Sequence, residues 1–180
     1  MVIVSGGSLE VFRREIEPVL DQWTDVVIPR EVEIMPNFGY TPDYAWMYSY
    51  EKRLKYRIEA TCGFSLGAME RLLFGEDGVF SEAVSNAFVH GNHRRGDLPI
   101  EIVTAVGERG LVFSVTDRGE GFDVATTLEA VSRGLVYFKC AGNGLRVLNA
   151  RKEVLASYGG GGRTLHLRVE WPNMAHPRGT

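Results

Sequence analysis

Glu82, Asn86 and His90 recur at intervals of four residues in a stretch whose apolar residues also keep helical spacing. Because an α-helix has about 3.6 residues per turn, side chains four apart lie along one side of it. The amide carbonyl of Asn86 is a suitable oxygen ligand for Mg²⁺, and the Glu82 carboxylate can act as a base. The alternative is that these polar residues simply form a solvated helix edge.

A second polar group begins at Asp117, where an alternating apolar run ends in an Asp-Arg-Gly-Glu-Gly-Phe sequence. Asp117 continues the inward face of that run, so its carboxylate is expected at the buried side of a sheet's end. A buried carboxylate needs donors; an adenine 6-amino group supplies one, whereas guanine presents a carbonyl oxygen there. Gly119 and Gly121 leave room for a flat base to approach the backbone. The alternative is an ordinary Asp-Gly-rich turn.

A third group is Gly142-Asn143-Gly144-Leu145, which opens a short helical pattern. Glycines at the start of a helix let backbone N–H groups close on phosphate oxygens, aided by the helix dipole. The alternative is a glycine-rich helix entry that binds nothing. The chain has no Gly-Lys pair of a P-loop, and its glycine pairs lack the third glycine of a dinucleotide-binding motif.

The elements around these groups are predicted from apolar periodicity. A helix is expected from residue 79 to about His90, because apolar residues recur there every four positions. Hairpins are expected from residues 100–106 with 111–117, and from residues 153–158 with 164–171, each pair flanking a Gly-containing turn. Residues 124–141 keep helical spacing between Gly-rich edges and are interpreted as a mobile lid.

The last predicted strand alternates apolar and polar residues, as expected for a sheet covered on one side only. The sequence therefore predicts an α/β fold, a two-layer sandwich whose mixed, mostly antiparallel sheet is covered by helices on one face. We expect a single domain over residues 1–180, with a core over 79–171 and a divergent part over 1–60. That part is predicted to hold a helix over 9–23, a strand near 32–35 and an aromatic-rich segment, 36–56, that packs against the domain.

Composition narrows the class of protein. The 180 residues include 44% hydrophobic and 24% charged residues, which is typical of globular proteins. The net charge of −3 argues against nucleic acid as the main partner. Two cysteines without metal-ligand spacing favour a reducing compartment, and no apolar stretch approaches the ~20 residues of a membrane span. A cytoplasmic location is expected.

Taken in order, these groups resemble the nucleotide-binding boxes of the GHKL ATPase and kinase superfamily. The stretch from Glu82 to Gly91, Glu-Ala-Val-Ser-Asn-Ala-Phe-Val-His-Gly, resembles most closely the anti-sigma factor serine kinases, as does Gly144-Leu145 leading to the later Gly-rich turn. The resemblance covers roughly residues 79–171. It implies an ATP-binding domain that uses Mg²⁺, and a homodimer.

The resemblance also implies roles for individual residues: Asn86 coordinates Mg²⁺, Glu82 is the catalytic base, Asp117 binds adenine and Thr164 supports that contact through water. The glycines of the pocket and lid would be Gly119, Gly121, Gly142 and Gly144, followed by Leu145. Two further residues stay open from sequence. His90 can contact phosphate or cap its helix, and Lys139 can reach the γ-phosphate or stay solvated.

The leading interpretation is a serine/threonine protein kinase that phosphorylates a small regulator, such as an anti-anti-sigma factor, and restrains a sigma factor. One alternative is the catalytic domain of a histidine kinase, although no histidine of the sequence lies in an upstream helical dimerisation hairpin. The other is an ATP-sensing adaptor that binds a partner through residues 36–56 without phosphorylating it.

Overall fold

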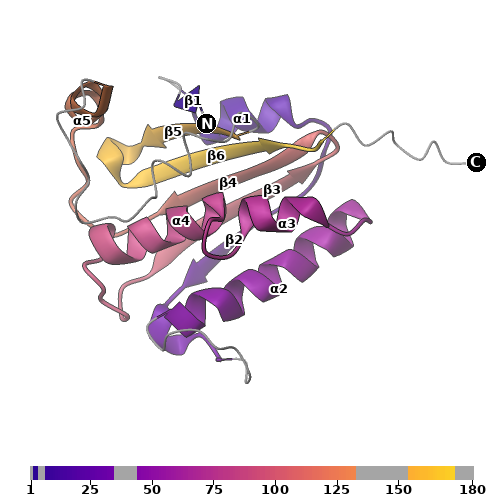
Figure 1. Ribbon diagram of the computed structural model, residues 1–180, viewed down its shortest axis with the longest axis horizontal. Helices are drawn as coiled ribbons and strands as arrows, with labels where there is room; N and C mark the ends of the chain where they lie inside the picture. Colours follow the sequence, from indigo (N-terminus) through magenta and orange to yellow (C-terminus); the bar gives the residue numbers. More distant parts are fainter. Residues whose placement is uncertain (1, 4–6, 35–43, 133–153, 173–180) are drawn as a thin grey trace, which may run out of the picture.

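The computed structural model describes residues 2–3, 7–34, 44–132 and 154–172 (Figure 1). Its strands are β1 (Val2–Ile3), β2 (Val19–Val27), β3 (Ile100–Gly107), β4 (Gly110–Thr116), β5 (Val154–Gly159) and β6 (Thr164–Glu170). Its α-helices are α1 (Leu9–Glu15), α2 (Ala45–Cys62), α3 (Ala68–Leu73), α4 (Val79–Asn86) and α5 (Val124–Ser132). Short 3-10 turns are η1 (Pro29–Glu31) and η4 (Gly160–Gly162), and a π-helix, η3 (Ala87–Gly91), continues α4.

The described strands form a six-stranded sheet in the order β1-β5-β6-β4-β3-β2. Every neighbouring pair is antiparallel except β1 with β5. Helices α2, α3 and α4 lie below the sheet in Figure 1, and the main hydrophobic core fills the space between. The two-layer α/β sandwich with a mostly antiparallel sheet is thereby confirmed.

Helix α1 adds a feature that the sequence did not predict. It lies on the opposite face of the sheet (Figure 1). There Phe12 and Ile16 are buried against Ala105 and Val112. Ser8 caps the helix, since its hydroxyl accepts the Val11 N–H. One part of the sheet's second face is therefore also covered.

Both predicted hairpins are present. Strand β3 pairs with β4 from Glu101 opposite Thr116 to Gly107 opposite Gly110. Strand β6 lies between β4 and β5, and its inward residues Leu165, Leu167 and Val169 are buried as the alternation predicts. This register brings the end of β4 and the start of β6 side by side.

The helix predicted to reach His90 does so, with a change of type part-way. Regular α-helical bonding ends at Asn86, and the wider turns of η3 extend it to Gly91. The Asn92 N–H closes the π turn on the Ala87 carbonyl at 2.8 Å. Such π turns are uncommon and occur often at functional sites.

The helix predicted over residues 9–23 is wrong beyond Glu15. Pro18 has no N–H with which to continue a helix, and the chain after it forms the edge strand β2. The strand predicted near residues 32–35 is also wrong for its described part, because residues 32–34 follow η1 without strand pairing.

The aromatic-rich segment is largely part of helix α2, and its packing is mostly as predicted. Trp46 and Tyr50 are buried in the main core, and Tyr44 and Tyr48 pack against it. Tyr56 alone among the described aromatics of this segment is exposed, while Phe38 and Tyr40 lie outside the described residues. Of the predicted lid, α5 is helical as expected, and residues 133–141 lie outside the described part.

Candidate functional site

Helix α4 and its π continuation carry the first group of predicted site residues. Glu82 and Asn86 are half-buried, and His90 is exposed one turn further on. On the other side of the helix Val79, Phe80 and Val84 are buried in the core. The helix is thus anchored by its apolar face, and its polar edge lies along the rim of a cavity.

Glu82 and Asn86 interact with each other. Burial raises the pKa of the Glu82 carboxyl, and a hydrogen bond from the Asn86 side chain opposes that rise. A carboxylate can only accept, so the donor is the Asn86 amide N–H. The carbonyl oxygen of Asn86 is therefore left for another partner, which is the atom that a magnesium ion would use.

Asp117 follows β4, and both its backbone N–H and its side chain are hydrogen-bonded. The Asp117 N–H donates to the Arg163 carbonyl at 3.1 Å, and its Oδ1 accepts the Gly119 N–H at 2.7 Å. Burial raises the pKa of the Asp117 carboxyl, while the Gly119 N–H and the nearby Arg163 and His93 lower it. The result is a half-buried carboxylate with one oxygen engaged by the backbone.

The glycines of this turn have a packing reason that sequence analysis did not find. A methyl group at Gly119 would overlap the Gly91 carbonyl, and one at Gly121 would overlap the Gly161 carbonyl. Gly121 also has a φ of 78°, which other residues rarely adopt. The turn is therefore clasped between the end of η3 and the turn η4.

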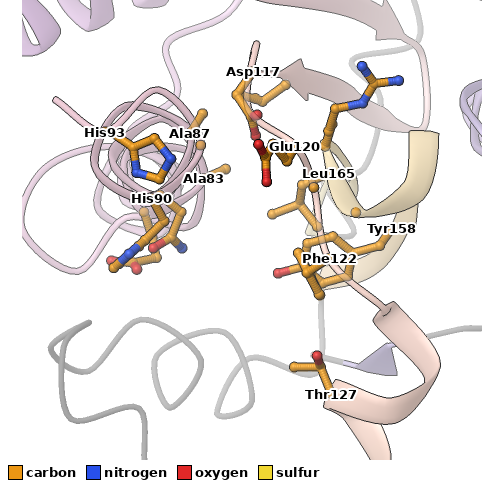
Figure 2. A pocket seen from close by; sticks show the side chains of 17 residues that line it. Ala83, Ala87, His90, His93, Asp117, Glu120, Phe122, Thr127, Tyr158 and Leu165 are labelled. Carbon is orange, nitrogen blue, oxygen red and sulfur yellow. The ribbon is translucent and has the colours of Figure 1, made fainter. Parts of the chain in front are cut away.

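These elements enclose a cavity of about 420 Å³ (Figure 2). That volume lies within the range of ~300–1,000 Å³ typical of small-molecule sites. Of the residues predicted from sequence, those that line it are Glu82, Asn86, His90, Asp117 and Gly121. The structure thus brings together the helix edge and the Asp-Gly turn, two groups that are far apart in sequence.

Other predicted site residues lie elsewhere or cannot be placed. Gly119 is not among the residues that line the cavity, but its N–H donates to the Asp117 carboxylate. The Thr164 hydroxyl pairs with that of Thr116 at 3.0 Å, and the neighbouring Leu165 lines the cavity; a water-mediated role for Thr164 stays a prediction. Four predicted residues lie outside the described part of the chain: Lys139, Gly142, Gly144 and Leu145.

Several cavity residues were missed by sequence analysis. Phe122 and Tyr158 meet edge to face, with ring centroids 5.2 Å apart, and together with Leu165 they form an apolar wall (Figure 2). Figure 2 also shows His93 beside the helix end that carries His90. The inward alternation of β5 and β6 could have identified Tyr158 and Leu165, whereas His93 lies in a loop without periodicity.

The sequence profile of the histidine kinase-like ATPase domain matches residues 78–169, which include α4, β3, β4 and all but the last residue of β6. This chain belongs to the histidine kinase-like ATPase domain family. No curated protein sequence matches it. The fold and the GHKL resemblance drawn from the sequence are thereby confirmed, and domains of this family bind ATP, in general with Mg²⁺.

The polar residues that line the cavity of the ATPase domain fit ATP and Mg²⁺. A magnesium ion prefers oxygen ligands, takes few of them from protein and leaves the rest to water and phosphates. Among the described residues no cluster of three or more His, Cys, Asp or Glu could hold a metal by itself. An ion at Asn86 would thus depend on a bound phosphate chain.

No helix of the described residues is long and apolar enough to span a membrane.

Proposed function

We propose that this ATPase domain is an ATP-dependent serine/threonine protein kinase of the anti-sigma regulatory type, which phosphorylates a small regulatory protein. One observation carries the proposal. Glu82 and Asn86, hydrogen-bonded to each other, share a single cavity with Asp117. Transfer of phosphate from ATP to a hydroxyl requires three kinds of side chain: a proton acceptor, a magnesium ligand and a carboxylate that recognises adenine.

Asp117 is the proposed adenine contact. Its Oδ1 is held by the Gly119 N–H, which leaves Oδ2 to accept a hydrogen bond from the adenine 6-amino group. The apolar side chains of Val115, Leu165 and Phe122 line the same cavity and suit the faces of a flat base. A 6-carbonyl base would instead bring an acceptor against the carboxylate and bind more weakly.

Asn86 is the proposed metal ligand. Asn86 lines the cavity, and because its amide N–H is engaged by Glu82, its carbonyl oxygen is the side-chain atom that remains for a metal ion. Bound Mg²⁺ would neutralise charge on the phosphates. The same hydrogen bond fixes the Glu82 carboxylate beside Asn86, at the phosphate end of the site.

Glu82 is the proposed general base. Burial raises the pKa of its carboxyl, which makes it a stronger base than a carboxylate in water. In transfer to a protein, Glu82 would take the proton of the acceptor's hydroxyl as the oxygen of that hydroxyl bonds to the γ-phosphorus. The bond from that phosphorus to the β,γ-bridging oxygen breaks, and ADP leaves.

The positions of the histidines favour a hydroxyl acceptor over a histidine. His90 and His93 line the cavity itself. His166 lies on the other face of the sheet, in register with Ser114 and Ser157. In the described part of the chain, therefore, no histidine lies on a separate helix that could present it to the cavity.

The test is transfer of label from γ-³²P-ATP, with Mg²⁺, to the proteins encoded by neighbouring genes. We expect label on one of them in a bond that survives acid, as serine and threonine phosphoesters do. Label that acid removes would indicate phosphohistidine and contradict the proposal. A partner that binds only with ATP present and never acquires label would favour the adaptor interpretation instead.

A further inference from the structure

The loop between η3 and β3 contains a buried amide that the proposed chemistry does not use. Asn92 has no exposed surface, although it follows a helix end and precedes the exposed residues His93, Arg94 and Arg95. A fully buried polar side chain is uncommon in a surface loop and needs partners for each of its polar atoms.

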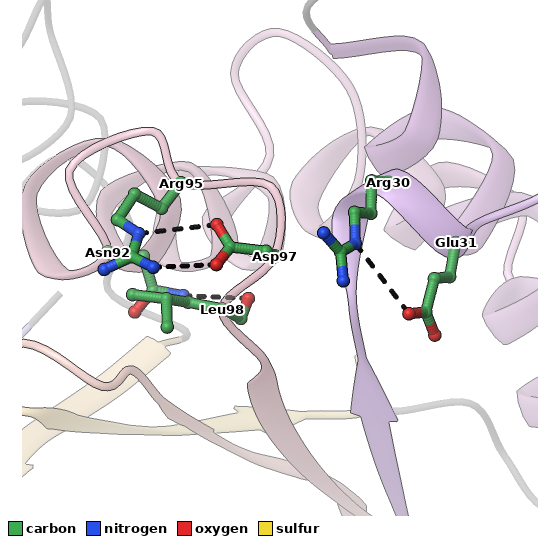
Figure 3. Close-up of polar contacts among 6 residues, drawn as sticks. All are labelled: Arg30, Glu31, Asn92, Arg95, Asp97 and Leu98. Carbon is green, nitrogen blue, oxygen red and sulfur yellow. Dashed lines mark hydrogen bonds and ion pairs between the residues drawn. The ribbon is translucent and has the colours of Figure 1, made fainter.

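All the hydrogen-bonding capacity of the Asn92 amide nitrogen is used within the protein. Its Nδ2 donates to the carbonyl of Leu98 at 3.2 Å (Figure 3) and to that of Pro99, also at 3.2 Å. Its Oδ1 accepts the Arg118 N–H at 2.8 Å. Asn92 therefore ties the end of the helix to the start of β3 and to the residue that follows Asp117.

Asp117 is also in direct contact with the same helix end. A methyl group at Gly91 would overlap the Asp117 carboxylate, so only glycine allows the two segments to approach this closely. The Gly91 carbonyl in turn leaves no room for a side chain at Gly119. Gly91 sets how near Asp117 comes to the helix, and Asn92 holds it there through Arg118.

The loop that carries Asn92 is itself fixed in an unusual conformation. His93 and Arg94 have φ of 51° and 60°, values that cost non-glycine residues free energy. The Arg94 N–H donates to the Phe88 carbonyl, and Arg95 forms two hydrogen bonds with Asp97 (Figure 3). A backbone in this conformation needs stabilising contacts, and the hydrogen bonds of the buried Asn92 side chain supply some of them.

We propose that Asn92 is a positioning residue for base recognition: it fixes the Asp117 carboxylate relative to the helix that carries Glu82 and Asn86, and so determines how well adenine is distinguished from a 6-carbonyl base. This inference rests on the proposed nucleotide-binding function. The reason is geometric. A hydrogen bond to a carboxylate weakens steeply when the acceptor is misplaced, whereas the phosphate end of the site does not contact Asn92.

The experiment compares calorimetric titrations of ATP and inosine triphosphate, both with Mg²⁺. The wild type is expected to bind ATP at least about tenfold more tightly, since a charged hydrogen bond has that effect. Asn92→Ala should lower this ratio about tenfold, mainly through ATP, with inosine triphosphate affinity changed less than about threefold. Gly91→Ala, which displaces Asp117 from the other side, should lower the ratio similarly.

Leu72→Ala serves as the control, because Leu72 is buried in α3 away from the cavity. It should lower thermal stability and leave the ratio unchanged. A wild type that binds no ATP would overturn the proposed function as well. A wild type that prefers ATP, with a folded Asn92→Ala or Gly91→Ala that keeps the full preference, would overturn the positioning role alone.

A second readout needs no nucleotide. Because Asn92 is the side chain that accepts the Arg118 N–H, hydrogen exchange at Arg118 should accelerate at least about tenfold in Asn92→Ala and stay unchanged in Leu72→Ala. Unchanged protection of the Arg118 amide in Asn92→Ala would contradict the proposal directly.

Discussion

At the scale of single residues, the Asp117 carboxylate is the proposed centre of base recognition. Asp117→Asn keeps an oxygen for the Gly119 N–H but replaces the charged acceptor in the cavity. Loss of a charged hydrogen bond costs about 1.5–3 kcal/mol, or roughly ten- to a hundredfold in affinity. Calorimetric titration checks this expectation, and wild-type ATP affinity in the folded variant would remove base recognition from Asp117.

Asn86 is the residue on which magnesium dependence should rest. Asn86 lines the cavity, and Asn86→Ala removes its carbonyl oxygen, so ATP should bind with nearly the same affinity with Mg²⁺ and with a chelator. Ser85→Ala, a change at the adjacent half-buried residue, is the matched control and should keep the wild-type difference. A persistent magnesium effect in Asn86→Ala would assign the metal to another ligand.

The sequence predicts those candidate site residues that lie on a helix or at the end of a strand. Glu82 and Asn86 follow from helical spacing, and Asp117 follows from strand alternation. Asn92 was not predicted, because its importance comes from contacts with Leu98, Pro99 and Arg118, and such contacts depend on how a loop folds. Nothing in a Gly-Asn pair after a helix distinguishes this role from a simple helix end.

At the scale of elements, a buried carboxylate joins α2 to α4. Glu51 accepts the Ser81 hydroxyl at 2.5 Å and is almost completely buried. Burial raises the pKa of its carboxyl to about 7, opposed by hydrogen bonds from Ser81 and the Gly75 backbone. The helix that carries Glu82 is therefore attached to α2 through a group that titrates near neutral pH.

This attachment predicts a pH dependence of stability. The folded pKa of Glu51 is above its ordinary value of 4.5, so the folded protein binds the proton more tightly than the unfolded chain. The contribution is fully present below about pH 4.5 and is lost as pH rises through about 7. Its size is about 3 kcal/mol, to order of magnitude.

Urea denaturation from pH 5 to 8 tests the assignment to Glu51. The free energy of unfolding of the wild type should fall relative to that of Glu51→Gln across this range, because glutamine cannot ionise. Parallel curves for the two proteins would show that the Glu51 carboxyl ionises without cost and would contradict the assignment.

The edge strand β2 shows why part of the fold could not be predicted. Its fully inward residues are Trp23 and Val27, four apart, which imitates a helical pattern. Between them Asp25 takes the inward position and accepts hydrogen bonds from the Trp23 indole and the Tyr50 hydroxyl. A carboxylate that is satisfied by tertiary contacts breaks the alternation by which a strand is recognised. The hairpins of β3 to β6, which lack such an interruption, were predicted correctly.

At the scale of the whole molecule, one core joins the divergent N-terminal part to the family domain. Phe80 of α4 lies 4.7 Å from Phe113 of β4, between ring centroids, and stacks with Tyr50 of α2 at 6.4 Å. Phe80→Ala should therefore lower the free energy of unfolding by about 3–5 kcal/mol, as aromatic truncations in cores do. Leu20→Ala, at an exposed position of β2, should change it by less than about 1 kcal/mol. Equal effects in denaturant titrations would contradict this account of the core.

The central claim is that ATP binding at this site is followed by phosphate transfer, and a substitution at Glu82 tests it most directly. Glu82→Gln keeps the size of the side chain and an oxygen that can accept the Asn86 N–H, while it removes the base. The direct measurement is the single-turnover rate of phosphate transfer to the labelled partner, with ATP affinity measured alongside. We predict transfer slower by about 10²–10⁴-fold and ATP affinity within a few-fold of wild type. Transfer at the wild-type rate in Glu82→Gln would contradict the assignment of Glu82 as the base of a serine/threonine kinase.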